Sequence, residues 1–210
     1  LIMKPSNLTF EESAAVPLAG LTALHALRNA GKIQSGQKVL INGSSGGVGT
    51  FSIQLAKYFG AEVTAVCRTG KIDQALSLGA DYVIDHTKED FTRTGKKYDL
   101  ILGIGGSYSI FDFRRAMSPN GRYVNIGGKK IFQSLLLGPV LSLFWKQKMT
   151  FVASIPNQTD LQFLKTLIET NKLKPVIDRS FPLNEVPEAI RYLEAGNAGG
   201  KIVINIGIER

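Results

Sequence analysis

Short apolar runs rich in β-branched residues alternate along the chain with stretches whose apolar positions recur at helical spacing. From residue 37 onward these runs cover 38–41, 62–66, 82–84, 99–102 and 122–126, and their length and composition predict buried strands. Between the first two, apolar residues from Phe51 to Phe59 follow the helical period, and Gly60 then ends the helix. Repeated strand, helix, strand units require a parallel sheet with right-handed crossovers. The sequence therefore predicts an α/β fold with a doubly wound (Rossmann) sheet.

The segment before this repeat predicts a helix that leads into the first strand. Thr9 followed by two glutamates is a helix start signal, and the apolar region 14–30 continues to Gly31, which closes it. Because proline lacks the N–H that a helix interior needs, we expect an interruption at Pro17.

The C-terminal part departs from the repeat and is expected to leave the main sheet. It predicts a helix at 159–169, a short strand at 176–177, a helix at 186–193 and a last strand at 201–206, with 196–200 as a tight connection only. We divide the chain into a helical lead-in (1–36), a Rossmann domain (37–172) and a C-terminal segment (173–210).

Composition narrows the class of protein further. With 44% apolar and 20% charged residues among 210, the chain is typical of a globular protein. A single cysteine, Cys67, excludes an internal disulfide, and two histidines argue against a metal cluster, so a cytoplasmic location is expected. The net charge of +8 suggests an anionic partner. The basic residues occur as scattered pairs, however, which favours solvated surface over a nucleic-acid tail.

No membrane partner is expected either. The longest uncharged apolar stretch, 131–145, is too short to span a bilayer, and residues 1–5 lack the features of a signal peptide. That stretch is either a core helix or a surface that closes over a substrate or meets a second subunit. The chain starts like the middle of a longer sequence, without an initiator Met.

A glycine-rich loop joins the first strand to its helix. Gly43 to Thr50 has the sequence GSSGGVGT, in which Ser44 replaces the first glycine of the G-x-G-x-x-G pattern while Gly46 and Gly49 are kept. Small residues there let the backbone approach a pyrophosphate at the positive end of a helix, and the tight turn can shift to Gly43. The alternative is a plain tight turn, but the strand-to-helix context favours a dinucleotide site.

The position about 20 residues further on carries no carboxylate for a ribose hydroxyl. Arg68 stands there, just past the second strand. A guanidinium can bind a 2'-phosphate through two charge-assisted hydrogen bonds, and Lys71 can add a second cation. This favours NADPH over NADH, the alternative being that both residues are solvated loop charges.

Three other residues invite a chemical role. His86 ends the third strand, where loops come near the adenosine of a bound dinucleotide. It either stacks on the adenosine or contacts a phosphate, or it is simply an exposed residue, and the sequence favours neither alternative. His25 lies on the apolar helix and is expected to be structural. Cys67 is expected to pack, because no His, Asp or Asn partner can be placed beside it, and no catalytic triad can be assembled.

The chain resembles the medium-chain dehydrogenase/reductases, in particular their zinc-free quinone oxidoreductase branch. The resemblance rests on AVPLAGLTAL at 15–24, the glycine loop, LGADYVID at 78–85, PVIDR at 175–179 and GKIVI at 200–204. It spans essentially the whole chain and implies the cofactor half of a larger protein, whose β-rich N-terminal substrate domain is mostly missing. On this resemblance, 37–172 is the dinucleotide-binding domain, and 173–210 returns towards the substrate domain.

The resemblance also implies cofactor contacts that spacing could not reveal. It puts Thr22 near the nicotinamide and gives Gly127, Gly128 and the segment Phe151, Val152, Ala153 backbone contacts to its ring and carboxamide. The complete expected cofactor set is Thr22, Ser45, Gly46, Gly47, Val48, Arg68, Lys71, His86, Ile104, Gly127, Gly128, Phe151, Val152 and Ala153.

Three departures from the family pattern stand out. Leu18 occupies the position of a zinc-binding cysteine, which argues against a catalytic metal. Relatives often carry Ser at Arg68 and Tyr at His86, and usually an Asp at Gly103. No catalytic residue could be assigned.

By resemblance, the expected activity is hydride transfer from NADPH to an α,β-unsaturated carbonyl or a quinone, without zinc, in a homodimer. The protein would supply orientation and electrostatics, and the cofactor the chemistry. The alternatives are an NADPH-binding module without turnover of its own, such as a sensor, a structural protein or an inactive fragment, and a zinc alcohol dehydrogenase, against which Leu18 counts.

Overall fold

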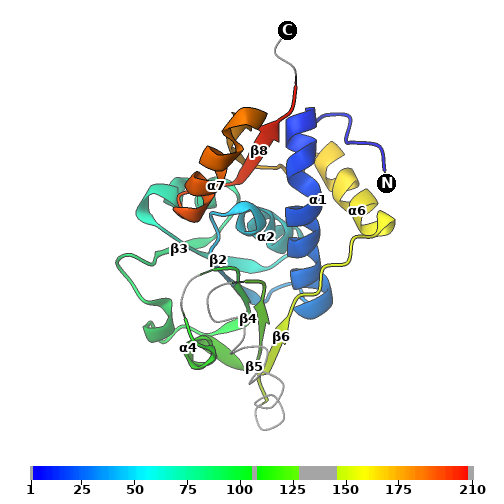
Figure 1. The fold of residues 1–210 in the computed structure, drawn as a ribbon. Coiled ribbons are helices and arrows are strands. Elements are labelled where there is room, and N and C mark those ends of the chain that lie inside the picture. Colours follow the sequence, from blue (N-terminus) through cyan, green and yellow to red (C-terminus); the bar gives the residue numbers. More distant parts are fainter. Residues whose placement is uncertain (1, 106–107, 128–145, 208–210) are drawn as a thin grey trace.

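Six parallel strands form the central sheet of the computed structural model, which describes residues 2–105, 108–127 and 146–207 (Figure 1). Their order is β3-β2-β1-β4-β5-β6. The strands are β1 (Lys38–Asn42), β2 (Glu62–Cys67), β3 (Tyr82–Asp85), β4 (Tyr98–Gly103), β5 (Met117–Asn125) and β6 (Lys148–Phe151). The doubly wound fold expected from the sequence is confirmed. Because the order reverses between β1 and β4, their carboxyl ends border the crevice where such sheets bind ligands.

Apolar layers cover both faces of the sheet. One layer packs the sheet against α1, α2, α3, α6 and the turn after α1, and the other packs it against α4 and the 3-10 turn Phe91–Arg93. The helices are α1 (Phe10–Leu24), α2 (Gly47–Tyr58), α3 (Ile72–Ser77), α4 (Ile110–Ala116), α6 (Gln158–Glu169) and α7 (Val186–Glu194). Alternate strand residues enter opposite layers, as in Val39 and Leu40, because successive side chains of a strand point to opposite faces.

The first helix begins as the sequence predicts but continues past its proline. Thr9 and Glu12 form a reciprocal capping box, which satisfies two free donors at the helix start. The expected interruption at Pro17 is wrong: α1 runs through it to Leu24 and continues as a π-helix, His25–Ala30, before Gly31. Pro17 removes one N–H donor, but the buried side chains before and after it hold both halves of the helix against the core.

The C-terminal elements form a second sheet, as expected. β7 (Ile177–Pro182) and β8 (Lys201–Asn205) pair in parallel with each other and flank α7. Asn205 Nδ2 donates to Glu11 Oε1 over 3.0 Å, which ties this sheet to the start of α1. Strand β6 was not predicted, because its four residues adjoin the apolar stretch and show no repeat of their own. That stretch, 131–145, and Gly128 lie outside the described residues.

Candidate functional site

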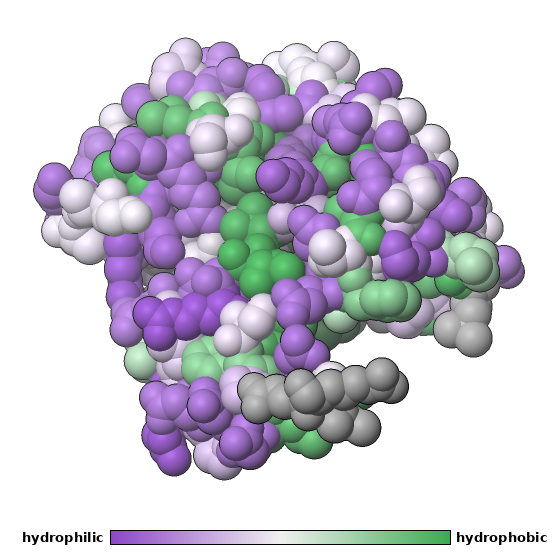
Figure 2. Space-filling view, turned by 90° about the horizontal axis from the view of Figure 1, so that it is seen from above, coloured by the Kyte–Doolittle hydropathy of each residue, from purple (hydrophilic) through white to green (hydrophobic). Residues whose placement is uncertain are grey.

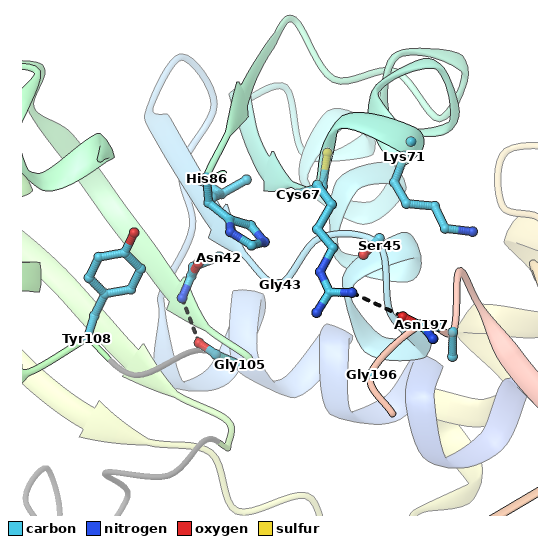
Figure 3. Close-up of a pocket in the computed structure, with 14 residues that line it drawn as sticks. Asn42, Gly43, Ser45, Cys67, Lys71, His86, Gly105, Tyr108, Gly196 and Asn197 are labelled. Carbon is cyan, nitrogen blue, oxygen red and sulfur yellow. Dashed lines mark hydrogen bonds between the residues drawn. The ribbon is translucent and has the colours of Figure 1, made fainter. Parts of the chain in front are cut away.

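A pocket of about 570 Å³ opens at the carboxyl ends of four neighbouring strands (Figure 3). Its volume lies in the usual range for ligand and cofactor sites. Its lining comes from β1 and the glycine loop, from the ends of β2, β3 and β4, and from the C-terminal segment: Asn42, Gly43, Ser45, Val66, Cys67, Arg68, Gly70, Lys71, His86, Gly105, Tyr108, Gly196, Asn197 and Ala198. The pocket therefore occupies the crevice that the strand order marks.

The glycine loop makes its turn at Gly43, as the sequence predicts. Gly43 has φ +89°, a left-handed conformation that favours glycine. Ser44 is buried, and its Oγ donates to the carbonyl of Val66 over 2.9 Å, so the replacement of the first glycine anchors the loop to β2. A β-carbon at Gly49 would overlap the backbone of Gly43 and Ser44. Gly49 therefore permits the close contact between loop and helix that the motif requires.

The start of α2 leaves backbone donors available beside the pocket. Its N-cap is Gly46, and no side chain caps this end of the helix. The first-turn N–H groups of a helix have no partner within the helix, and an anion can take that place. A β-carbon at Gly46 would meet no other protein atom closer than the Gly43 carbonyl at 4.0 Å, and at Gly70 and Gly105 it would meet nothing within 4 Å. The protein's own packing therefore does not require these glycines, and the space beside them suits a bound dinucleotide.

Replacing Gly46 by alanine tests whether that space is used. An N-cap change from glycine to alanine costs about 1 kcal/mol or less, so we expect Gly46→Ala to unfold in urea near the wild-type midpoint. We expect its NADPH affinity to fall about tenfold, which corresponds to about 1.4 kcal/mol, because the methyl group enters the space beside the free N–H groups. The measurement is calorimetric titration with NADPH, and unchanged affinity would contradict a dinucleotide at this loop.

The two expected cations both line the pocket, but the structure gives them different partners. The exposed Arg68 follows β2 directly and donates from Nη1 to Asn197 Oδ1 over 3.1 Å (Figure 3). Lys71 Nζ lies 3.7 Å from Asp178 Oδ1, and Asp178 also accepts a hydrogen bond from the Tyr192 hydroxyl. The lysine thus has a carboxylate partner, whereas within the described residues the guanidinium is hydrogen-bonded to a neutral amide.

The C-terminal loop is a wall of the pocket, so the expectation that 196–200 is only a tight connection is wrong. Gly196, Asn197 and Ala198 line it, and Gln74 of α3 donates to the carbonyl of Gly199. No sequence signal could have found this wall, because the loop and Arg68 are 129 residues apart.

Four other lining residues complete the pocket. The side chain of His86 is exposed, and its backbone N–H donates to the backbone carbonyl of Cys67. Burial raises the pKa of the Cys67 thiol above its ordinary value, which supports packing over nucleophilic chemistry. Asn42 Nδ2 donates to the carbonyl of Gly105 over 2.6 Å and so holds the loop after β4. Tyr108, which sequence reasoning missed, stacks in a tilted contact on Phe91.

Thr22, expected near the nicotinamide, lies in α1, while Ile104, Gly127 and the segment 151–153 lie at the ends of β4, β5 and β6. None of these residues lines this pocket. Three backbone N–H groups here donate to backbone carbonyls: that of Ile104 to Asn42, that of Gly127 to Gly103, and that of Val152 to Asn125. Thr22 Oγ1 donates to the carbonyl of Leu18 over 2.7 Å, while Phe151 and Ala153 are exposed.

The remaining loop residues of the expected set differ in their surroundings. Ser45 lines the pocket, and Val48 packs on the core. A β-carbon at Gly47 would overlap the side chain of Lys201, so this glycine accommodates β8.

Relatives usually carry an acidic residue at position 103, and the structure explains why this chain has glycine there. A β-carbon there would lie 2.5 Å from the Tyr123 hydroxyl and 2.8 Å from its ring. Tyr123 is 2% exposed and stacks on Phe113 with ring centroids 4.3 Å apart. The tyrosine fills the volume that an acidic side chain would need.

The structure also assembles a polar cluster that the sequence did not predict. His25 lies between the Ser154 hydroxyl and the Asp160 carboxylate. The sequence led us to expect no triad and could not reveal this cluster, because its members come from segments about 130 residues apart in the chain.

The fold and the pocket define a doubly wound α/β protein with a ligand crevice at its topological switch point. A model of the family described as zinc-binding dehydrogenase matches residues 78–204. The chain belongs to this family and is a quinone oxidoreductase-like member of the medium-chain dehydrogenase/reductases. The resemblance seen in the sequence is confirmed.

Individual relatives agree with this assignment. The chain is 39% identical over 207 residues to 2-methylene-furan-3-one reductase of Solanum lycopersicum, covering 97% of this chain and 49% of that protein. It is 33% identical over 214 residues to the chloroplast envelope quinone oxidoreductase homolog of Arabidopsis thaliana, covering 97% and 64%. The structure of the quinone oxidoreductase from Coxiella burnetii matches with a TM-score of 0.88 at 30% identity, covering 98% and 64%. The chain thus spans about half to two thirds of the length of these relatives.

The family name implies zinc, but the side chains that the structure describes do not form a site for it. Within residues 2–105, 108–127 and 146–207, no group of three or more His, Cys, Asp or Glu side chains is placed to bind a metal ion. Leu18, at the position of the zinc-binding cysteine, is 71% exposed and offers no ligand atom. The described donor set does not fit a zinc site. In the same part of the chain, no helix has the length and apolar character needed to cross a bilayer.

Proposed function

We propose that the chain is the cofactor-binding part of an oxidoreductase that transfers a hydride from NADPH to an α,β-unsaturated carbonyl or a quinone. The observation that carries the proposal is the pocket itself, where open glycine positions and an exposed guanidinium lie at the switch point of the sheet. The uncapped start of α2 directly follows Ser45, which lines the pocket. The relatives named reductases and quinone oxidoreductases support the reaction class.

Arg68 supports NADPH over NADH as the cofactor. It stands where NAD-binding relatives of this fold place an acid, and its one described hydrogen-bond partner is the neutral Asn197. A guanidinium is well suited to a 2'-phosphate, because its planar donors match two oxygens at once. Lys71 contributes less charge to that place, since Asp178 already faces it.

The chain's own residues would bind and orient the cofactor. NADPH, when bound, supplies the hydride. The glycine loop and α2 hold the pyrophosphate, while the ends of β4, β5 and β6 face the nicotinamide side. We further propose that the reaction does not use zinc and that the protein is a cytoplasmic homodimer; the dimer can be checked by light scattering at micromolar concentration.

The test is calorimetric titration of the chain with NADPH and NADH, in the wild type, Arg68→Ala and the matched control Arg191→Ala. Arg191, also exposed, pairs with Glu188 and does not line the pocket. A hydrogen bond to a charged group contributes about 1.5 to 3 kcal/mol, so Arg68→Ala should bind NADPH roughly tenfold to a hundredfold more weakly. NADH binding should stay within about twofold, and the control should bind both cofactors like the wild type.

Turnover is then measured in the complete protein that contains this chain, with 3-buten-2-one and 1,4-benzoquinone as probes. Oxidation of NADPH by either probe is expected. Binding of NADPH without its oxidation would indicate a cofactor-binding module without turnover. In the titration, an equal fall in affinity for NADPH and NADH in Arg68→Ala would remove the argument for NADPH.

A further inference from the structure

A buried polar cluster joins the end of α1 to the segment between β6 and α6. His25 is 2% exposed and Asp160 is 5% exposed. His25 Nδ1 lies 3.1 Å from Ser154 Oγ, and His25 Nε2 lies 2.8 Å from Asp160 Oδ2. Both ring nitrogens therefore have a polar partner inside the protein, one a hydroxyl and the other a carboxylate.

Asp160 is held as a carboxylate. Arg28 Nη2 donates to its Oδ1 over 2.7 Å, and Asn157 Nδ2 donates to its Oδ2 over 2.8 Å. Burial raises the pKa of Asp160, but the hydrogen bonds from Asn157, Arg28 and His25 outweigh burial and lower that pKa to about 2. An ionised carboxylate only accepts hydrogen bonds, so the proton of the facing imidazole nitrogen, Nε2, stays in place.

The fixed proton at Nε2 determines what the other ring nitrogen can do. When the ring is neutral, His25 Nδ1 has a lone pair and accepts the Ser154 hydroxyl proton. When the ring is protonated, Nδ1–H donates to Ser154 Oγ, and the hydroxyl proton can turn outward. Ser154 is only half-buried, unlike its two partners. The cluster can therefore pass a proton between a buried imidazole and the surface at Ser154.

Ser154 lies beside the part of the site proposed for the nicotinamide. It follows Phe151, Val152 and Ala153, and the N–H of Val152 donates to Asn125 at the end of the neighbouring strand β5. Thr22, the other residue expected near the nicotinamide, lies three positions before His25, the C-cap of α1, and residues three apart lie on the same helix face.

We propose that Ser154, His25 and Asp160 form a proton relay for the reduction of an enone, an inference that rests on the function proposed above. When bound, NADPH would supply a hydride to the β-carbon, and the C=C electron pair would move onto the carbonyl oxygen as an enolate. The α-carbon then takes the Ser154 hydroxyl proton, while the proton on His25 Nδ1 moves to Ser154 Oγ. His25 becomes neutral and regains its proton from solvent through Ser154. Asp160 and Arg28 are positioning residues, since they act through the ring.

The cluster also ties two helices together, and a suitable variant separates this structural role from the relay. His25→Gln keeps a donor and an acceptor at the end of a side chain of similar reach but cannot carry a titrating proton. A purely structural role would be restored by Gln, whereas a relay would not. The charged groups that face the ring from α1, its π-helical extension and α6 are Asp160 and, behind it, Arg28.

The experiment uses the complete protein with NADPH and 3-buten-2-one, in the wild type, His25→Gln, Ser154→Ala, Ser154→Thr and the control Ser77→Ala, whose exposed hydroxyl bonds only within α3. General acid catalysis contributes about a hundredfold or more, so we expect kcat to fall about a hundredfold in His25→Gln and Ser154→Ala. Ser154→Thr keeps a hydroxyl and should stay within about threefold of the wild type. Wild-type kcat should depend on pH because the relay moves a proton through His25, and this dependence should be absent in His25→Gln.

Calorimetric NADPH binding and the melting temperature are measured on the same samples. Wild-type affinity and melting temperature with low kcat in the variants support the relay. A kcat within threefold of the wild type in His25→Gln, with the pH dependence retained, overturns the relay and leaves the proposed function intact. If His25→Gln does not fold, the comparison of Ser154→Ala with Ser154→Thr decides in the same way. If the wild type binds NADPH but does not reduce the enone, both the proposed reaction and the relay are contradicted. If the wild type does not bind NADPH, the proposed cofactor site itself is contradicted.

Discussion

Asp160→Ala is expected to lower the free energy of unfolding by about 3 to 5 kcal/mol, the usual cost of removing one partner from a buried ion pair. Its side chain is 7% exposed and accepts hydrogen bonds from His25, Arg28 and Asn157. The alanine variant would leave these donors without their common acceptor. Urea unfolding at pH 7 measures the change. The control is Glu188→Ala, whose pair with Arg191 is exposed on both sides and should contribute less than about 1 kcal/mol.

The same carboxylate gives a pH dependence whose sign follows from its pKa. The folded-state pKa of Asp160 is lowered to about 2 from an ordinary value of 3.8, so the stabilisation is fully present above about pH 5 and is lost as pH falls through the folded value. This lowering of the pKa corresponds to about 2 to 3 kcal/mol of stability. Urea midpoints at pH 6, 4 and 2.5 should therefore fall more steeply for the wild type than for Asp160→Asn. Parallel curves would contradict the assignment of this carboxylate as the paired group.

Gly49→Val is the second change with a large expected effect. A β-carbon at this position would overlap the carbonyl oxygen of Gly43 and the backbone of Ser44, and neither can move as a flexible side chain could. Overpacking in a dense core costs about 1 to 3 kcal/mol and sometimes more; we expect about 3 kcal/mol here, together with loss of measurable NADPH binding because the loop is displaced.

Gly46→Ala is the matched comparison for this loop, since its β-carbon has open space. Gly49→Val should lower both the urea midpoint and the NADPH affinity. Gly46→Ala should lower the NADPH affinity alone. A Gly49→Val variant with wild-type stability and affinity would show that helix and loop do not need this close contact.

Local patterns were sufficient for the elements that build the sheet. Alternation of buried strands with amphipathic helices follows from side-chain periods of two and 3.6 residues, which the chain carries without reference to distant partners. The loop from Gly43 to Gly49 could also be predicted, because its need for small residues arises from contacts between residues close in sequence. Pro17 shows the limit of local rules, since packing on both sides of it kept α1 continuous.

By itself, then, the sequence determined the doubly wound sheet, the glycine loop at the switch point and the presence of Arg68 after β2. Only the tertiary structure decided what faces that arginine and what surrounds His25, because the partners Asn197, Asp160 and Ser154 are separated from them by 129 to 135 residues. Such contacts depend on how α6 and the C-terminal loop dock against the sheet. Their energetics come from burial and hydrogen-bond geometry, which exist only once the chain has folded.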